Sequence, residues 1–424
     1  MAGRVNVFYI SKPMKLILQH SQGNANVRAS AVGFAEAGLL GEFHTSIACF
    51  QGSLLDSIAD VSFFSEIRRR RFDVLLRPFT HTSPAIELGR LLSLRAGFHK
   101  FIKQETGIFC VDAAIRSLDK KVAGGLKNAK QNGIGAVYAY EDGALFSFQE
   151  ARRLGLKCFY DLPTGYWRAK LRILEEEKKR FPEWQNTIPG LFDSKDKLAG
   201  KDEEIKLADR IFVASQFTAS TLKDFPGKLP PVQVIPYGFP AVGTGRDYID
   251  NTDRQPVKLL FVGSLSQQKG IANLFNAVDA IGNSVSLTVI GRKGNEDCPA
   301  LNRELAKHRW IPSLPHQDIL NIMREHDVLV FPTLFDGFGL VISEAMSQGT
   351  PVIATFNSGG PDLIKHGENG WLVDAGSTAA LQAIIEELVK NPAAIVKAGR
   401  AAMETARLRP WEVFKQELAD AIVQ

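Results

Sequence analysis

Residues 327–355 place the tightest constraint on the fold. They read DVLVFPTLFDGFGLVISEAMSQGTPVIAT, which is an apolar run, a loop with two glycines, a helical stretch and a second short apolar run. A single short apolar run does not distinguish a strand from a buried helix, but alternation with helical stretches is typical of parallel strands joined by crossover helices. The segment therefore predicts an α/β unit with a buried parallel sheet.

The same alternation extends through the chain. Helices are expected to start near residue 26 and at 270–281, 318–325 and 340–347. Strands are expected at residues 15–20, 72–76, 135–140, 157–160, 209–214 and 232–235, then at 257–262, 285–290, 327–331, 351–354 and 371–373. This order implies right-handed crossovers and predicts an α/β fold with two doubly wound parallel-sheet domains.

The length of 424 residues exceeds what one hydrophobic core usually holds. The sequence PYGFPAVGTGRDYIDNTDRQP, rich in glycine, proline and polar residues, is typical of an interdomain linker. We therefore expect a first domain over residues 1–240, a linker at 241–256 and a second domain over 257–407. The final segment, 408–424, is expected to form a helix that begins around Pro410 and crosses back to the first domain.

Cysteine usage and hydropathy exclude several classes of protein. Cys49, Cys110, Cys158 and Cys298 show no metal-ligand spacing, and the eight histidines form no HExxH motif. No apolar run approaches the roughly 20 residues of a membrane-spanning helix, and no signal peptide is recognisable. These features predict a cytoplasmic protein with reduced cysteines and without a metal.

The net charge of +5 is unevenly distributed. Residues 1–250 hold 35 basic and 27 acidic residues, a balance of +8, whereas the remainder holds 16 and 19, a balance of −3. A basic first half suits an anionic partner such as a lipid phosphate or an acidic membrane face. The four arginines at 68–71 fit that hypothesis, although a basic run is also common at a solvated helix end. No nucleic acid partner is expected.

The loop after the strand at 327–331 has the chemistry of an anion site. Gly337 and Gly339 allow the backbone to approach a ligand, and the helix that follows offers free N–H groups and the positive end of its dipole. A diphosphate fits these demands. Glu344, about one turn into the helix, could then accept hydrogen bonds from ribose hydroxyls, and Asp336 could reach a sugar beyond the diphosphate. An ordinary strand–loop–helix unit with a solvated Glu344 is the alternative.

A second stretch, LLFVGSLSQQKGI, agrees with this interpretation. It predicts a strand, a turn at Gly263 and Lys269-Gly270 at the start of a helix. The lysine would supply a positive charge to a phosphate leaving group. Arg292, after the strand at 285–290, is either a further cation for the phosphates or a solvated turn residue.

Together these motifs resemble the family 4 retaining glycosyltransferases of the GT-B fold, which are also called glycosyl transferases group 1. Asp336 and Glu344 have seven residues between them, which include a Gly-Phe-Gly-Leu segment, as in that family. The chain differs at Ser264, where arginine is common, and at Asp336, where the family often has glutamate. The match is close over residues 257–373 and looser before them.

The resemblance implies two Rossmann-like domains that face each other across a cleft. It assigns ribose binding to Glu344, and catalytic roles to Asp336, Lys269 and Asp161. Asp161 would contact the donor sugar or orient the acceptor, unless it only caps the turn that follows. Base binding falls to Arg309, Trp310 and Ile311, and diphosphate binding to Gly263, Ser264, Lys269, Arg292, Gly337, Phe338, Gly339, Leu340 and Gly23.

The implied function is metal-independent, retaining transfer of a sugar from a UDP- or GDP-sugar to a polysaccharide, glycolipid or glycoconjugate acceptor. No cofactor is expected. The expected acceptor is a glycan or a lipid-linked molecule, and a peripheral contact of the protein with the membrane is compatible with this function. A nucleotide-sugar epimerase and a non-catalytic nucleotide-sugar-binding protein on the same fold remain alternatives. A dehydrogenase is disfavoured because neither half opens with GxGxxG.

Overall fold

The computed structural model describes residues 14–52, 70–188, 193–243, 246, 248, 256–294 and 297–424. The chain divides into two compact units. The first contains the residues up to Tyr160 together with 207–209 and 415–424, and the second contains Asp161–Lys206 and Arg210–Phe414. Most of the expected linker at 241–256, and Arg68 and Arg69 of the basic run, fall outside the described residues.

The first unit is built on a parallel sheet in the order β5-β2-β1-β6-β7. Leu18 of the central strand β1 is aligned with Phe43 of β2 and with Tyr138 of β6. All three side chains are buried, as expected for a sheet covered on both faces. The strands are β1 (Lys15–Gln19), β2 (Leu40–Thr45), β5 (Thr80–Thr82), β6 (Ile134–Tyr140) and β7 (Lys157–Leu162), with a separate small pair, β3 (Cys49–Phe50) and β4 (Arg71–Phe72).

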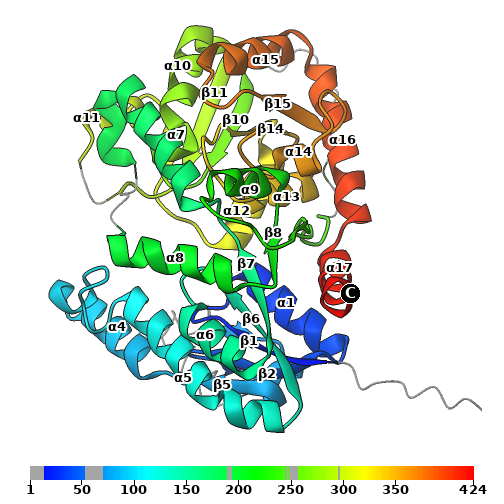
Figure 1. Ribbon diagram of the computed structural model, residues 1–424. Helices are drawn as coiled ribbons and strands as arrows, with labels where there is room; N and C mark the ends of the chain where they lie inside the picture. Colours follow the sequence, from blue (N-terminus) through cyan, green and yellow to red (C-terminus); the bar gives the residue numbers. More distant parts are fainter. Residues whose placement is uncertain are drawn as a thin grey trace, which may run out of the picture. The chain divides into compact units, whose positions relative to one another are not determined.

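Helices cover this sheet (Figure 1). The longest, α5, buries Leu118, Val122 and Leu126, which lie four residues apart on one face of the helix. The helices are α1 (Ala25–Glu36), α4 (Ala85–Arg95), α5 (Val111–Gln131) and α6 (Leu145–Leu154), with short 3₁₀ helices at Val74–Phe79 and His99–Ile102.

The second unit contains a parallel sheet in the order β12-β11-β10-β13-β14-β15. The chain runs outward from β10 to one edge and then returns to start again at β13, so the strand order reverses between these two neighbours. Ligands of such sheets bind outside the carboxyl ends of the strands at this switch point. The strands are β10 (Val257–Val262), β11 (Val285–Ile290), β12 (Arg309–Ile311), β13 (Val328–Phe331), β14 (Val352–Thr355) and β15 (Gly370–Val373), and a further parallel pair is β8 (Arg210–Val213) with β9 (Val232–Val234).

One apolar core joins the second sheet to its helices. Phe261 of β10, Phe275 of α10 and Ile385 of α15 are all fully buried in it. Around the sheet lie α10 (Ile271–Ile281), α11 (Pro299–Leu305), α12 (His316–Glu325), α13 (Leu340–Ser347), α14 (Gly360–Leu363), α15 (Thr378–Lys390) and α16 (Pro392–Leu408), while α7 (Trp167–Arg180), α8 (Lys195–Leu207) and α9 (Gln216–Thr221) precede it and α17 (Trp411–Val423) ends the chain.

The predicted fold class, α/β with two parallel sheets, is confirmed, but one predicted strand is wrong. Residues 72–76 were expected to form a strand, whereas β4 ends at Phe72 and a 3₁₀ helix occupies Val74–Phe79. Asp73 causes the change, because its Oδ1 accepts a hydrogen bond from the Leu75 amide at 2.9 Å and caps the helical turn. Strand β2, whose LGEFHT sequence is only weakly apolar, was not predicted.

All four cysteines are free and buried, in agreement with the prediction of reduced thiols. Among the described helices, none combines the length and the apolar character that crossing a lipid bilayer requires.

Gly270 at the switch point and Gly155 at the end of α6 have the same backbone conformation but different surroundings. Substituting each of them therefore tests how tightly the switch-point loops pack. Gly270 has φ 69° and ψ 26°, and a Cβ there would lie 2.0 Å from the carbonyl oxygen of Pro332. Gly155 has φ 71° and ψ 29°, and no described atom would lie within 4 Å of its Cβ. We expect Gly155→Ala to lower the free energy of unfolding by about 1–2 kcal/mol, and Gly270→Ala by a further 1–3 kcal/mol or so, because the loops must move apart. Urea unfolding of both variants measures the difference; equal losses would contradict the packing described.

Candidate functional site

The loops at the switch point hold the residues for which the sequence predicted chemistry. The chain leaves β10 through Gly263 and reaches the 3₁₀ turn Gln267–Lys269, and it leaves β13 through residues 332–339 before α13 begins at Leu340. Gly270, in the left-handed conformation, packs against the carbonyl of Pro332 and so joins the two loops. The site is therefore built on the carboxyl ends of two neighbouring strands.

Lys269 and Asp336 form an ion pair between these loops. The ammonium group contacts Oδ2 of Asp336, and the two side chains are 18% and 19% exposed. The other carboxylate oxygen, Oδ1, accepts a hydrogen bond from the Phe338 amide at 3.1 Å. Two of the residues predicted to be catalytic are thus in direct contact, in a half-buried setting where charges are screened less than at the surface.

The two glycines of the loop are required by the packing of the protein itself. A Cβ on Gly337 would lie 2.0 Å from the carbonyl oxygen of Pro163, and Gly339 has φ 81° with a Cβ position 2.6 Å from the Phe331 ring. The sequence had suggested that these glycines make room for a ligand. In the structure they allow the loop to lie against neighbouring protein atoms.

Hydroxyl groups fix the direction of the loop. The Gly337 carbonyl accepts hydrogen bonds from the Ser215 hydroxyl at 2.6 Å and from the Thr218 hydroxyl at 2.9 Å. Ser215 also caps the N-terminus of α9. Sequence reasoning missed both residues, because a capping serine gives no signal for a contact more than a hundred residues away.

The segment after β14 supports the same loop from a third direction. Backbone hydrogen bonds run from the Asp336 amide to the Asn357 carbonyl at 3.1 Å and from the Gly359 amide to the Phe338 carbonyl at 2.8 Å. The Asn357 side chain also donates to the Leu334 carbonyl at 2.9 Å. Three connections thus hold the loop before any ligand arrives, which is the preorganisation that charge stabilisation requires.

Glu344 lies one turn into α13 with its side chain 23% exposed. Burial raises the pKa of this carboxyl above its ordinary value, and His316, whose Nδ1 lies 3.8 Å from Oε1, acts in the opposite direction. A carboxylate that is largely withdrawn from water gains from hydrogen-bond donors. Paired hydroxyl groups on a ligand would provide them.

The loops after β10 and β11 lie against each other. The Gly263 amide donates to the Ile290 carbonyl at 3.0 Å, and the Leu265 amide donates to the Arg292 carbonyl at 3.1 Å. Ser264 is exposed at the turn. The Arg292 side chain is also exposed, and its guanidinium donates to the Ser313 hydroxyl at 3.3 Å.

The predicted base-binding residues form the edge strand β12 and differ in their surroundings. The Trp310 indole donates to the Gly291 carbonyl at 2.9 Å, and the Ile311 carbonyl accepts from the Gly291 amide at 3.0 Å. Both contacts are with the loop that leaves the carboxyl end of β11. Arg309 instead lines a hollow of about 560 Å³ beside the amino ends of β10 and β11, which is not the edge where the switch-point loops lie.

Two predicted residues lie apart from these loops in the sequence. Asp161 is buried at 5% exposure near the end of β7 and belongs to the second unit. Gly23 belongs to the first unit and has φ 71°, and its amide donates to Nδ1 of His20 at 2.9 Å. Burial, together with the Arg70 charge, lowers the pKa of that histidine to about 4, which keeps the ring neutral and able to accept the bond.

Two groups of three potential metal-ligating side chains occur among the described residues, and neither includes Asp336 or Glu344. They are Glu42 with His44 and His81, and Asp279 with Glu304 and His308. The positive charges offered by the described switch-point loops come from Lys269 and from the N-terminal end of α13.

Comparison with known proteins agrees with this geometry. Residues 249–407 match the model of the family described as glycosyl transferases group 1. The glycogen synthase of Mycobacterium tuberculosis is 28% identical over 156 residues, which are 35% of this chain and 38% of that protein. The D-inositol 3-phosphate glycosyltransferase of Corynebacterium glutamicum is 31% identical over 172 residues, 38% of this chain and 41% of that protein. The matched region thus spans about two fifths of these relatives' own length.

Solved structures match nearly the whole chain in fold. The sucrose-phosphate synthase of Thermosynechococcus elongatus has a TM-score of 0.61 at 18% identity and covers 96% of this chain and 98% of that one. Anabaena Alr3699/HepE, in complex with UDP and glucose, has a TM-score of 0.61 at 16% identity and covers 96% and 99%. At these identities the likeness establishes the fold alone, which is GT-B.

The fold, the Asp336–Glu344 segment and the family match agree with one another, and they confirm the resemblance found in the sequence: residues 249–407 match the glycosyl transferases group 1.

Proposed function

We propose that the chain transfers a sugar from a nucleotide-diphosphate sugar, UDP- or GDP-linked, to a polysaccharide, glycolipid or glycoconjugate acceptor, with retention at the anomeric carbon and without a metal ion. The observation that carries the proposal is the Lys269–Asp336 ion pair beside the N-terminal end of α13. The pair holds a cation where an anion would also meet the helix dipole.

Lys269 is the residue best suited to the leaving diphosphate. Its ammonium group can donate three hydrogen bonds, and Asp336 accepts from it through one oxygen, Oδ2. A phosphate oxygen can therefore join the pair without displacing Asp336. As the glycosidic bond breaks, negative charge grows on the diphosphate, and a fixed cation stabilises that state more than the ground state. In this proposal the lysine and the α13 amides take the part that a divalent metal takes in other transferases.

Asp336 fits a positioning role better than the role of a nucleophile. One of its oxygens pairs with Lys269 and the other accepts the Phe338 amide, so both are already hydrogen-bonded. A carboxylate stabilised in this way is a weak nucleophile. This supports retention by direct attack on the same face of the sugar, without a covalent intermediate on Asp336.

The nature of the donor is supported by the structural neighbours. One of them was solved in complex with UDP and with UDP-glucose, and the curated relatives include a glycogen synthase and an inositol phosphate glycosyltransferase. We therefore favour a uridine diphosphate sugar. A nucleotide-sugar epimerase would change the donor without an acceptor, and a binding protein would leave the donor intact, so product analysis separates these alternatives.

Replacement of Lys269 tests the leaving-group role. We expect Lys269→Met to lower kcat for nucleotide diphosphate release by about 10²- to 10³-fold, because one preorganised charge is lost. The matched control is Lys307→Met, which also removes a lysine from an ion pair, with Asp279, but beside the amino ends of the strands. Its kcat should stay within a factor of two or so of wild type. A thermal unfolding midpoint for each variant verifies folding, and an unchanged kcat in folded Lys269→Met would refute the assignment.

The raised pKa of Glu344 predicts how nucleotide affinity depends on pH. The ionised carboxylate accepts the ribose hydrogen bonds, so at neutral pH Glu344→Gln should bind nucleotide diphosphate about 10- to 100-fold more weakly than wild type. As the pH falls, the wild-type carboxyl takes up a proton, at a higher pH than an ordinary glutamate does because its pKa is raised. The ratio of the two dissociation constants should then fall towards one.

Titration calorimetry with UDP and GDP over a series of pH values measures this ratio, and dividing the constants cancels the protonation of the nucleotide itself. Glu404→Gln, an exposed glutamate of α16 paired with Arg407, is the control and should bind as wild type does. A ratio near one at neutral pH would show that Glu344 does not hold the ribose.

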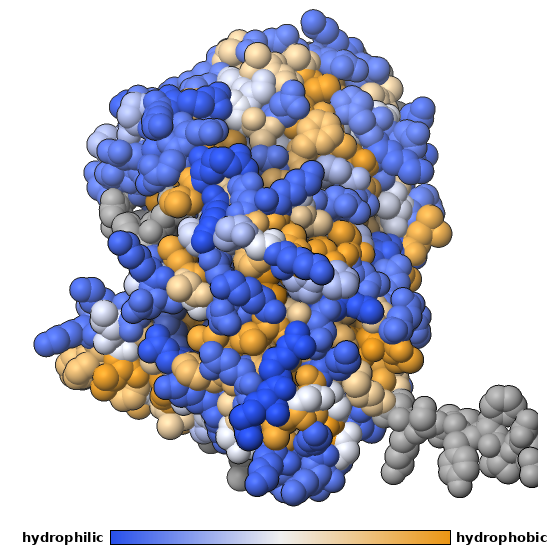
Figure 2. Space-filling model, in the orientation of Figure 1, coloured by the Kyte–Doolittle hydropathy of each residue, from blue (hydrophilic) through white to orange (hydrophobic). Residues whose placement is uncertain are grey.

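The first unit carries a surface suited to an anionic membrane, in keeping with a lipid-linked acceptor. Leu92 of α4 is 58% exposed, and in the segment between α4 and α5 Phe98 is 57% and Ile108 62% exposed. Apolar surface is visible in Figure 2 around the helix labelled α4 in Figure 1. The exposed charged residues between Leu88 and Ile108 are Arg95, Lys100 and Lys103. Apolar side chains bordered by cations are typical of peripheral binding to anionic lipids.

Vesicle sedimentation tests this surface. Wild type should bind vesicles of anionic phospholipid, less at high salt, and should bind zwitterionic vesicles weakly. The double variant Leu92→Ser/Phe98→Ser should lose at least about tenfold in partitioning, since each side chain contributes roughly 1.5–3 kcal/mol when buried. The control Leu408→Ser removes an equally apolar residue, 81% exposed, from α16. Equal binding by the double variant and this control would exclude the α4 surface as the contact.

A further inference from the structure

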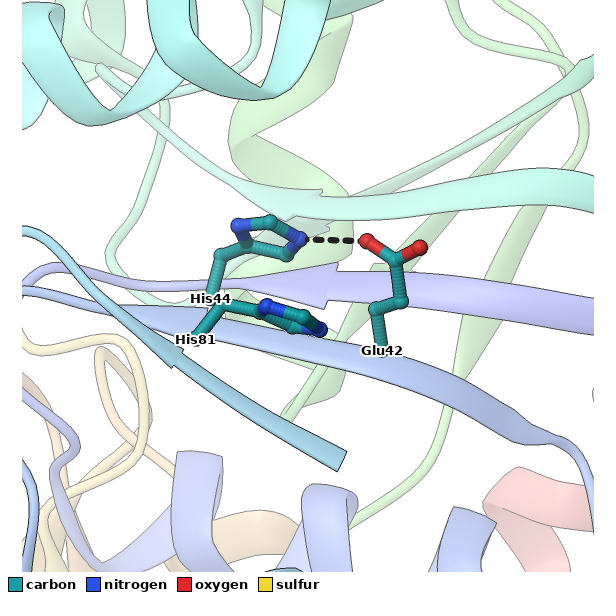
Figure 3. A group of neighbouring side chains, drawn as sticks. All are labelled: Glu42, His44 and His81. Atoms are coloured by element: carbon teal, nitrogen blue, oxygen red, sulfur yellow. Dashed lines mark hydrogen bonds and ion pairs between the residues drawn. The ribbon is translucent and has the colours of Figure 1, made fainter. Parts of the chain in front are cut away.

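Three side chains with metal-binding chemistry meet at the edge of the first unit's sheet. Glu42 and His44 lie two residues apart on β2, so their side chains project from the same face. His81 lies on the edge strand β5 and is the register partner of His44. Figure 3 shows the three side chains on one side of these two strands. None of them belongs to the residues proposed for the donor.

The group is compact. Each residue offers one ligand atom, and these atoms lie within 4.8 Å of one another. Nε2 of His44 is 2.7 Å from Oε2 of Glu42, and the two imidazole rings are stacked with centroids 4.8 Å apart and planes 17° apart. Two imidazoles with one carboxylate form the ligand set of His₂Glu zinc sites.

His44 itself is incompletely satisfied. The residue is 8% exposed, and among the described residues its Nδ1 has no hydrogen-bond partner. Buried ring nitrogens normally have a hydrogen-bond partner. In His44, only Nε2 has one among the described residues, namely the Glu42 carboxylate. His81 is exposed and can turn about its side-chain torsions. The His81 ring can therefore turn a nitrogen lone pair towards His44 and Glu42.

We propose that Glu42, His44 and His81 bind one divalent transition-metal ion of the kind that imidazole and carboxylate ligands hold, such as zinc. The ligand set contains no thiolate and offers two nitrogens and one oxygen, and the exposure of His81 leaves the fourth position to water. The ion would join β5, the edge strand, to β2. This site is independent of the proposed transfer reaction.

The second group of possible ligands provides an internal comparison. Asp279, Glu304 and His308 also lie close together, but the Lys307 ammonium is 2.7 Å from both carboxylates. A resident cation satisfies these oxygens and repels a second one. The Glu42 group has no such lysine in hydrogen-bonding contact among the described residues, and so it is the better metal site.

A competition titration tests the proposal on the full chain. The protein is treated with EDTA, dialysed and titrated with Zn²⁺ against a chromogenic chelator. Wild type should bind one equivalent tightly, and His81→Ala, which changes an exposed side chain, should weaken that binding at least about tenfold. The control His99→Ala removes an exposed histidine from the first unit and should leave the binding unchanged.

Two further readings make the outcome decisive. Zn²⁺ should raise the thermal unfolding midpoint of wild type and of His99→Ala more than that of His81→Ala, because a ligand stabilises the state that binds it. The Co²⁺-substituted protein should lack a thiolate charge-transfer band, which excludes the four cysteines as ligands. No zinc binding by wild type, equal binding by His81→Ala, or a thiolate band would each overturn the proposal.

Discussion

The ion pair between Lys269 and Asp336 connects the two loops that leave the central strands of the second sheet, and the proposed chemistry depends on it. Each partner reaches the other because a glycine lets its loop pack closely: Gly270 lies against the Pro332 carbonyl, and Gly337 lies against the Pro163 carbonyl. The energy that holds this geometry comes from packing and backbone hydrogen bonds in the protein. A ligand that binds there meets charges already in place.

The sequence predicted the architecture of the second unit well because its strands are buried on both sides. Runs such as VKLLFV and VLVF leave little ambiguity when helical stretches follow them. The first unit was harder to predict. Strand β2 reads LGEFHT. Glu42 and His44 stand where a buried strand would have apolar residues, so the apolar pattern does not reveal this strand. The interpretation of residues 72–76 as a strand failed because one side chain, Asp73, caps a 3₁₀ turn.

Contacts within the site were less predictable than the identity of its residues. Asp336 and Lys269 could be named from the motif, but their pairing, and the hold of Ser215 and Thr218 on the Gly337 carbonyl, depend on tertiary packing that no local pattern encodes. The two glycines of the loop also show that a local pattern does not reveal tertiary contacts. The sequence indicated that side chains are excluded at 337 and 339, and the structure shows that neighbouring protein atoms exclude them. The first unit adds two features of its own, the apolar surface at α4 and the Glu42–His44–His81 group, and neither depends on the donor chemistry.

The central claim is that Lys269 and the first amides of α13 bind a nucleotide diphosphate without a metal ion. A crystal structure of the protein grown with UDP in the presence of EDTA tests it most directly. The account predicts electron density for the diphosphate between the Lys269 ammonium and the N-terminal end of α13, with the ribose against Glu344. A nucleotide bound elsewhere, or density that appears only when EDTA is replaced by Mg²⁺, would contradict it.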